Sequence, residues 1–149
     1  MVERKSKPSI ATTHNVGFLL AKASQRWNEL LAGKFAGRGF ADVRPSYGSI
    51  LVPLFEEDGP RMGELARRAR LSKQTMTTMV RLLERDGLVV RVPDPGDGRA
   101  SLIHLTERAR AFQPVAEEVL RELEARVEET LTKQQATVLK RALKGVIEL

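Results

Sequence analysis

The chain has no cysteine, and its 149 residues include only one tryptophan, one tyrosine and two histidines. The absence of cysteine excludes disulfides, thiolate-ligated zinc and redox chemistry at a thiol. The two histidines, His14 and His104, are far apart in the sequence and lack the partners of a structural zinc site. We therefore expect no metal site and no cofactor.

Long apolar runs and catalytic patterns are also missing. No segment approaches the roughly 20 apolar residues that a membrane-spanning helix needs. The basic residues Arg4, Lys5 and Lys7 are not followed by an apolar stretch of signal-peptide length. There is no Ser–His–Asp pattern, no paired carboxylates and no phosphate-binding glycine loop. We expect a cytoplasmic protein that is not an enzyme and has no membrane partner.

Positive charge is in excess and is unevenly distributed. Lysine and arginine total 25 against 19 aspartates and glutamates, for a formal net charge of +6. This balance favours a polyanionic partner such as nucleic acid, although the same charge also serves solubility. Between positions 61 and 99 there are nine basic residues and five acidic ones. The basic character is therefore concentrated in the middle of the chain.

Helical periodicity dominates both ends of the sequence. Apolar residues recur at steps of three and four over residues 16–35, which predicts a long amphipathic helix that ends in a glycine-rich loop. A second helix follows residues 44–46, and Pro53 inside its pattern is expected to kink or shorten it. Near the C-terminus, Thr106 caps a helix that runs to about residue 131. The pair Thr132 and Gln135 forms a capping box for a last helix.

The middle of the chain has a different pattern. A short helix over residues 62–69 precedes a helix that is capped by Ser72 and stopped by Gly87. Two β-branched or apolar runs, 88–92 and 101–105, predict strands. Residues 93–98, which lie between them, predict a tight polar turn. Helix, turn, helix and hairpin in this order predict a winged helix-turn-helix.

We predict a mainly α fold with a small β-hairpin wing, in which a winged helix-turn-helix is flanked by N- and C-terminal dimerisation helices. The terminal helices carry apolar surface that has no counterpart within a single small domain, so we expect a second protomer to cover it. Within one continuous folded unit we expect four regions. They are a flexible tail (1–13), a dimerisation helix and loop (14–43), the DNA-binding region (44–105) and the C-terminal dimerisation helices (106–149).

The helix after Ser72 has two chemically different faces. One face is apolar and must be buried, whereas the other carries small or hydrogen-bonding side chains and no acid before Glu84. An acidic first turn would favour the helix dipole, so its absence suits an approach to phosphates and base edges in a major groove. Glutamine pairs with adenine, threonine offers a hydroxyl and a methyl group, and arginine reaches phosphate or guanine. The polar face comprises Lys73, Gln74, Thr75, Thr77, Thr78 and Arg81.

The turn of the hairpin carries a second candidate DNA contact. Arg99 is expected to project from it and to enter a minor groove, whose narrow form attracts arginine. Asp97 either orients that guanidinium or ties the turn to a neighbouring basic residue. The alternative is a simple Asx-type turn with a surface arginine.

Three segments, Leu71–Thr77, Leu83–Val89 and Asp94–Ala100, together with Leu105-Thr106, resemble the MarR family of bacterial transcriptional regulators. The resemblance is strong from about Arg44 to Thr106. It implies a homodimer whose terminal helices interlock, with the helix after Ser72 in the major groove and the wing in the minor groove. Many such proteins are repressors that a small, often phenolic anion releases from DNA.

The resemblance also assigns residues by position. Asp97 and Arg99 are the wing pair. Two departures are expected to weaken non-specific affinity or shift it to Arg61 and Arg67: many members have arginine where this chain has Gly98, and Thr78 replaces a frequently basic residue. The residues assigned to the major groove are Ser72, Lys73, Gln74, Thr75, Thr77, Thr78 and Arg81.

The aromatic residues near the first two helices have two interpretations. Packing in the core or in a dimer interface is the ordinary role of Trp27 and Tyr47. By resemblance, an effector pocket for a small aromatic anion lies between the first, second and fifth helices. Its candidate lining is His14, Phe18, Trp27 and Tyr47.

The sequence therefore predicts a homodimeric, DNA-binding transcriptional regulator of the bacterial nucleoid, a repressor of MarR type acting at a pseudo-palindromic operator. A protein–protein interaction module with the same fold would carry an acidic or apolar face on the helix after Ser72, and this chain has neither. A sensor enzyme would need an activated nucleophile or an acid–base pair, and neither pattern is present.

Overall fold

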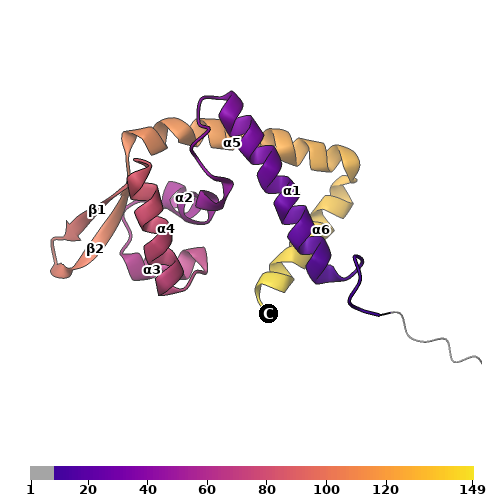
Figure 1. Cartoon of the computed structure of the whole chain (residues 1–149), viewed down its shortest axis with the longest axis horizontal. Coiled ribbons are helices and arrows are strands. Elements are labelled where there is room, and N and C mark those ends of the chain that lie inside the picture. Colours follow the sequence, from indigo (N-terminus) through magenta and orange to yellow (C-terminus); the bar gives the residue numbers. More distant parts are fainter. Residues whose placement is uncertain (1–8) are drawn as a thin grey trace, which may run out of the picture.

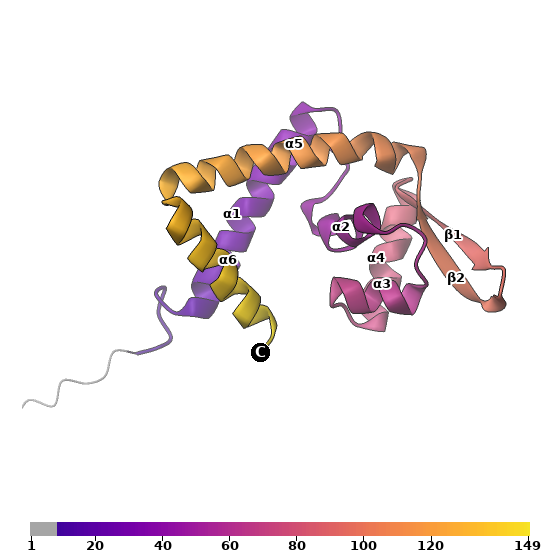
Figure 2. The ribbon, with the colours of Figure 1, turned by 180° about the vertical axis from the view of Figure 1, so that it is seen from behind.

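In a computed structural model that describes residues 9–149, the helices form an arch (Figure 1). Helix α5 (Glu107–Thr130) runs along its top. Helix α6 (Lys133–Ile147) descends from the C-terminal end of α5, and α1 (Val16–Gly37) crosses α5 near its middle. A second lobe, the winged lobe (residues 45–105), contains three helices and a hairpin and lies below the N-terminal end of α5, as the reverse view in Figure 2 also shows. The predicted mainly α fold with a β-hairpin wing is confirmed.

The second lobe follows the predicted order of elements. A 3-10 turn, η1, leads into α2, and Pro53 lies inside α2 without ending it. Arg68 donates hydrogen bonds to the carbonyl oxygens of Pro53 and Glu57, so it caps the end of α2. The bounds are η1 Pro45–Tyr47, α2 Gly48–Glu56, α3 Met62–Ala69, α4 Lys73–Arg85, β1 Val89–Asp94 and β2 Asp97–Leu105.

The helix boundaries are set by the caps that the sequence predicts. The side chains of Ser72, Thr106 and Thr132 each accept a hydrogen bond from the backbone N–H three residues later. Thr132 and Gln135 form the full capping box. Gly87 has a positive φ of 72°, which lets the chain turn sharply after α4. These four predictions are confirmed.

The hairpin differs from the expected one. Its strands are longer, so only Pro95 and Gly96 remain in the turn. Asp94 pairs with Asp97 but Pro93 pairs with Ser101, which leaves residues 98–100 as a bulge in β2. Arg99 therefore lies on a bulged strand beside the turn rather than at the turn itself. The expectation of a six-residue turn over residues 93–98 is wrong, because Pro93 and Asp94 belong to β1, and Asp97 and Gly98 belong to β2.

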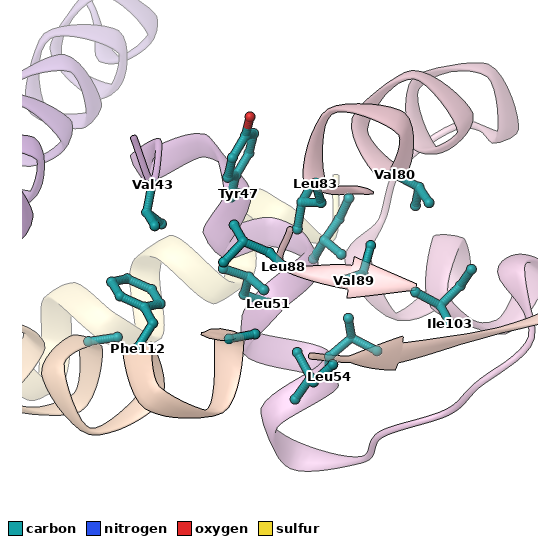
Figure 3. Close-up of a cluster of buried hydrophobic side chains, with 14 of the residues drawn as sticks. Val43, Tyr47, Leu51, Leu54, Val80, Leu83, Leu88, Val89, Ile103 and Phe112 are labelled. Atoms are coloured by element: carbon teal, nitrogen blue, oxygen red, sulfur yellow. The ribbon is translucent and has the colours of Figure 1, made fainter. Parts of the chain in front are cut away.

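One core joins both lobes. Tyr47 and Leu51 pack among side chains from α4, both strands and α5 in Figure 3. Phe112 of α5 meets Phe35 of α1 edge-on, with ring centroids 4.9 Å apart. The N-terminal half of α5 thereby ties the winged lobe to α1. Labelled members of the cluster are Val43, Tyr47, Leu51, Leu54, Val80, Leu83, Leu88, Val89, Ile103 and Phe112.

The free ends of α1 and α6 leave apolar side chains in solvent. On α1 these are Val16, Phe18 and Leu19. Within the described residues no helix is long and apolar enough to cross a membrane. The exposed apolar side chains of α6 are Val138, Leu139, Leu143, Val146 and Ile147.

Candidate DNA-binding surface

Helix α4 is oriented by the side chains that it buries. Met76, Val80 and Leu83 are fully buried at steps of four and three residues. The opposite side of the helix faces solvent, and its first turn contains no acid. Thr77 is half-buried at the edge of this side. The exposed residues of the predicted contact set are Ser72, Lys73, Gln74, Thr75, Thr78 and Arg81.

Several hydroxyl groups on α4 are used within the helix. The Ser72 hydroxyl accepts from the Thr75 N–H (3.1 Å) and donates to the Thr75 hydroxyl (2.9 Å). The Thr77 hydroxyl donates to the Lys73 carbonyl (2.9 Å) and the Thr78 hydroxyl to the Gln74 carbonyl (3.1 Å). By contrast, the side-chain N–H groups of Lys73, Gln74 and Arg81 have no partner within residues 9–149. These three side chains keep their donors for an external ligand.

Ion pairs and side-chain hydrogen bonds within the chain separate the basic residues between positions 61 and 99 into two groups. Arg91 donates to Glu84 (2.6 Å), and Arg61 to Asp94 (2.7 Å). Arg67 pairs with Glu64, and its hydrogen bond lowers the pKa of that carboxyl. The engaged group comprises Arg61, Arg67, Arg68, Arg70, Arg85 and Arg91.

The second group is formed by Lys73, Arg81 and Arg99, whose side chains make neither an ion pair nor a hydrogen bond within the part of the chain that the structure describes. Two of them extend from the exposed side of α4 and one from the wing. Both Arg61 and Arg67, to which we expected phosphate affinity to shift, are held by carboxylates of their own chain. DNA phosphates would have to compete with those carboxylates.

The wing is held by two aspartates with different partners. Asp97 accepts a hydrogen bond from the backbone N–H of Arg99 (3.0 Å), which is the Asx-type alternative, and leaves the guanidinium free to point outward. Asp94 accepts from the Gly96 N–H (2.9 Å) and from Arg61 (2.7 Å). These two hydrogen bonds lower the pKa of Asp94. Asp94, which the sequence reasoning did not single out, therefore anchors the wing to the start of α3.

A polar junction fixes the C-terminal end of α4. The carboxylate of Asp86 accepts hydrogen bonds from Arg85 (3.0 Å) and from the hydroxyl of Tyr47 (2.5 Å). These bonds lower the pKa of Asp86, while burial raises the pKa of Tyr47. Arg108 of α5 donates to the Asp86 carbonyl (2.8 Å) and to Asp42 (2.6 Å). The sequence analysis missed this junction because its members come from four separate elements.

A cavity of about 220 Å³ lies between α1, α2 and α5. Of the four predicted lining residues only Trp27 reaches it, because Tyr47 is buried in the winged-lobe core. His14 precedes α1. Phe18 lies in the first turn of α1, about 13 Å along the helix axis from Trp27. The structure does not bring the four together. Among the described residues that line the cavity, only Arg44 is charged.

Comparison with known proteins identifies the family that has this architecture. The family model described as "MarR family" matches residues 45–101. The HTH-type transcriptional repressor Rv2887 of Mycobacterium tuberculosis is 40% identical over 116 residues, which cover 69% of this chain and 84% of the relative. The chain belongs to the MarR family. It is a DNA-binding transcriptional regulator of that family.

Solved structures share the MarR fold over nearly the whole chain. The transcriptional repressor CouR, bound to a 23-mer DNA duplex, superimposes with a TM-score of 0.77 at 24% identity and covers 95% of this chain and 99% of its own. The PcaV regulator of Streptomyces coelicolor, in complex with its natural ligand, gives a TM-score of 0.78 at 22% identity, with coverages of 96% and 97%. At these identities the similarity concerns the fold. The contact residues on α4 and the wing remain predictions.

Proposed function

We propose that this MarR-family protein is a homodimeric transcriptional repressor. Each protomer places α4 in a major groove of a pseudo-palindromic operator and Arg99 in a flanking minor groove. The observation that carries the proposal is the distribution of unpaired cations. Lys73, Arg81 and Arg99 are exposed and lack acidic partners within residues 9–149, and all three lie on the outer side of α4 or on the wing. Free cations at these places suit phosphate contacts and base readout.

The named relatives support the same proposal. Rv2887 is a transcriptional repressor, and CouR is a repressor bound to a DNA duplex. A protein that acts on an operator works where the chromosome lies, so we place it in the bacterial cytoplasm. Regulation rather than catalysis is the activity that the chain supports. The described residues include no cluster of three His, Cys, Asp or Glu side chains that would hold a metal ion.

Replacing Gln74 by alanine is the direct test of base readout. A glutamine on the exposed side of α4 forms paired hydrogen bonds with adenine, a contact that contributes about 1–3 kcal/mol of discrimination. We expect gel-shift titrations to show weaker operator binding and about a tenfold smaller ratio between operator and scrambled duplex. Gln134→Ala is the matched control, since Gln134 is also exposed and is the second residue of α6. An unchanged ratio for Gln74→Ala would contradict the proposed readout.

The dimer is proposed from the apolar side chains that α1 and α6 leave in solvent. Sedimentation at micromolar concentration should give a particle of twice the 16.6 kDa chain mass. Leu139→Glu, in the middle of the exposed face of α6, should shift the protein towards monomer. Val90→Glu is the control, because Val90 is similarly exposed (46% against 41%) but lies on the hairpin. A wild-type monomer, or equal behaviour of the two variants, would refute this interface.

Modulation by a small aromatic anion is the finer part of the proposal. The cavity between α1, α2 and α5 has a mostly apolar lining that includes Trp27 and the charged residue Arg44. PcaV, which shares the fold, was solved with its natural ligand. Salicylate should raise the melting temperature, because a ligand that binds only the folded state stabilises it. It should also weaken operator binding. Salicylate that changes neither quantity, or acts equally on Arg44→Ala, would count against this site.

A further inference from the structure

The exposed side of α4 carries a line of three residues, Gln74, Thr78 and Arg81. They follow one another at steps of four and three, so their side chains are neighbours on one side of the helix. The buried residues Met76 and Val80 lie on the opposite side. Thr78 is thus the middle residue of the outward line, with a hydrogen-bonding side chain before it and a cation after it.

The hydroxyl of Thr78 is already engaged. It donates its single proton to the carbonyl oxygen of Gln74 (3.1 Å), in the way threonine often bonds one turn back in a helix. Donation to a base edge would require that bond to break. Gln74 and Arg81, which flank Thr78 on the exposed side, have free N–H donors within residues 9–149 and supply that chemistry instead. Without rearrangement Thr78 offers outward its γ-methyl group, while its hydroxyl oxygen could only accept a hydrogen bond from the amino group of an adenine or a cytosine.

A methyl group in a major groove has one specific counterpart. Thymine is the base that presents a methyl group there, on C5, and small apolar side-chain groups contact it. We propose that Thr78 is a specificity-determining residue whose γ-methyl contacts the C5-methyl of one thymine in each operator half-site. The inference rests on the proposed function, since it requires α4 in the major groove. Thr77, whose hydroxyl is engaged in the same way, is half-buried and does not occupy the outward line.

Deoxyuridine provides the test because it is thymidine without the C5-methyl. Duplexes selected from a random pool by the wild-type protein define the operator. Each thymine of one half-site is then replaced singly by deoxyuridine. Affinities are measured for the wild type, for Thr78→Val, which keeps the methyl and removes the hydroxyl, and for Thr78→Ser, which does the reverse. At one position we expect deoxyuridine to weaken binding by the wild type and by Thr78→Val about fourfold, which is the equivalent of one buried methyl group. The affinity of Thr78→Ser should be the same with deoxyuridine as with thymidine at that position.

Thr137 provides the matched control for changes in helix stability. It is exposed on α6 and its hydroxyl donates to the Lys133 carbonyl (3.0 Å), so Thr137→Val and Thr137→Ser should keep the wild-type pattern of deoxyuridine penalties. The inference is overturned if the penalties are the same in all three Thr78 proteins, or if Thr78→Val rather than Thr78→Ser loses the penalty. It is also overturned if the selected half-site contains no thymine. Failure to retain any duplex at low salt would instead overturn DNA binding itself.

Discussion

Replacing both Arg81 and Arg99 by alanine is expected to weaken operator binding several hundredfold. The dimer would lose four cation contacts, and contacts of this kind contribute about 1 kcal/mol or more each, with about 1.4 kcal/mol for each tenfold in affinity. For each phosphate contact that is lost, binding also releases fewer counterions from the DNA. The slope of log affinity against log salt should therefore fall by about 3 to 4. Fluorescence anisotropy with a labelled operator at several salt concentrations measures both quantities. Arg99→Ala alone removes two of the four contacts and should account for about a thirtyfold loss.

The double variant Arg67→Ala, Arg91→Ala separates direct contact from overall charge. It removes the same number of positive charges from the same lobe, but these arginines are paired with Glu64 and Glu84. We expect a much smaller loss of affinity and a nearly unchanged salt slope. Equal losses for the two double variants would mean that the unpaired arginines act only through the net charge of the lobe. The assignment of Arg81 and Arg99 to the DNA interface would then be wrong.

Replacing Asp86 by alanine should lower the free energy of unfolding by about 1–3 kcal/mol. The buried hydroxyl of Tyr47 donates to this carboxylate and would lose its partner. Tyr47→Phe removes the donor instead and leaves Asp86 bonded to Arg85, so its cost should be smaller, about 1 kcal/mol. Urea unfolding followed by circular dichroism compares the three proteins. A loss for Tyr47→Phe as large as that for Asp86→Ala would contradict the argument.

The same carboxylate should make the stability depend on pH. Hydrogen bonds from Arg85 and Tyr47 lower the pKa of Asp86 in the folded protein below its unfolded value. The folded state therefore binds the proton less readily than the unfolded state. The stabilisation from Asp86 is fully present above the unfolded pKa of about 4 and is lost as the pH falls through the folded pKa. The difference between wild type and Asp86→Ala should be constant near neutral pH and shrink below about pH 4. A difference that grows in acid would contradict this sign.

The sequence predicts the structure best where the deciding contacts join residues close together in the chain. Ser72, Thr106 and Thr132 cap helices because each side chain reaches a backbone N–H only three residues away. The buried side of α4 follows from the spacing of Met76, Val80 and Leu83. The hairpin was predicted less well. Beside its bulge at residues 98–100, Asp94 accepts a hydrogen bond from the Gly96 N–H and Asp97 accepts one from the Arg99 N–H, and alternation of residue types does not report such bonds.

The predicted pocket lining shows the opposite case. By resemblance to the family, four aromatic or titratable residues are expected to line one pocket between the first, second and fifth helices, yet a helix spreads residues along its axis by about 1.5 Å each. Phe18 therefore ends far from Trp27, and Tyr47 turns into the winged-lobe core. Arg44, which does line the cavity, carried no signal in the sequence beyond its charge.

By itself the sequence determined the family, the order of elements, the helix caps and the polar side of α4, because each of these depends on residues within a few positions of one another. Only the tertiary structure decided which cations remain free for DNA. Arg61 is neutralised by Asp94, 33 positions away, and Arg108 reaches Asp42 across 66 positions, whereas Arg81 and Arg99 find no acid within residues 9–149. Pairing between distant segments depends on where the folded chain places each charge, and composition cannot report that.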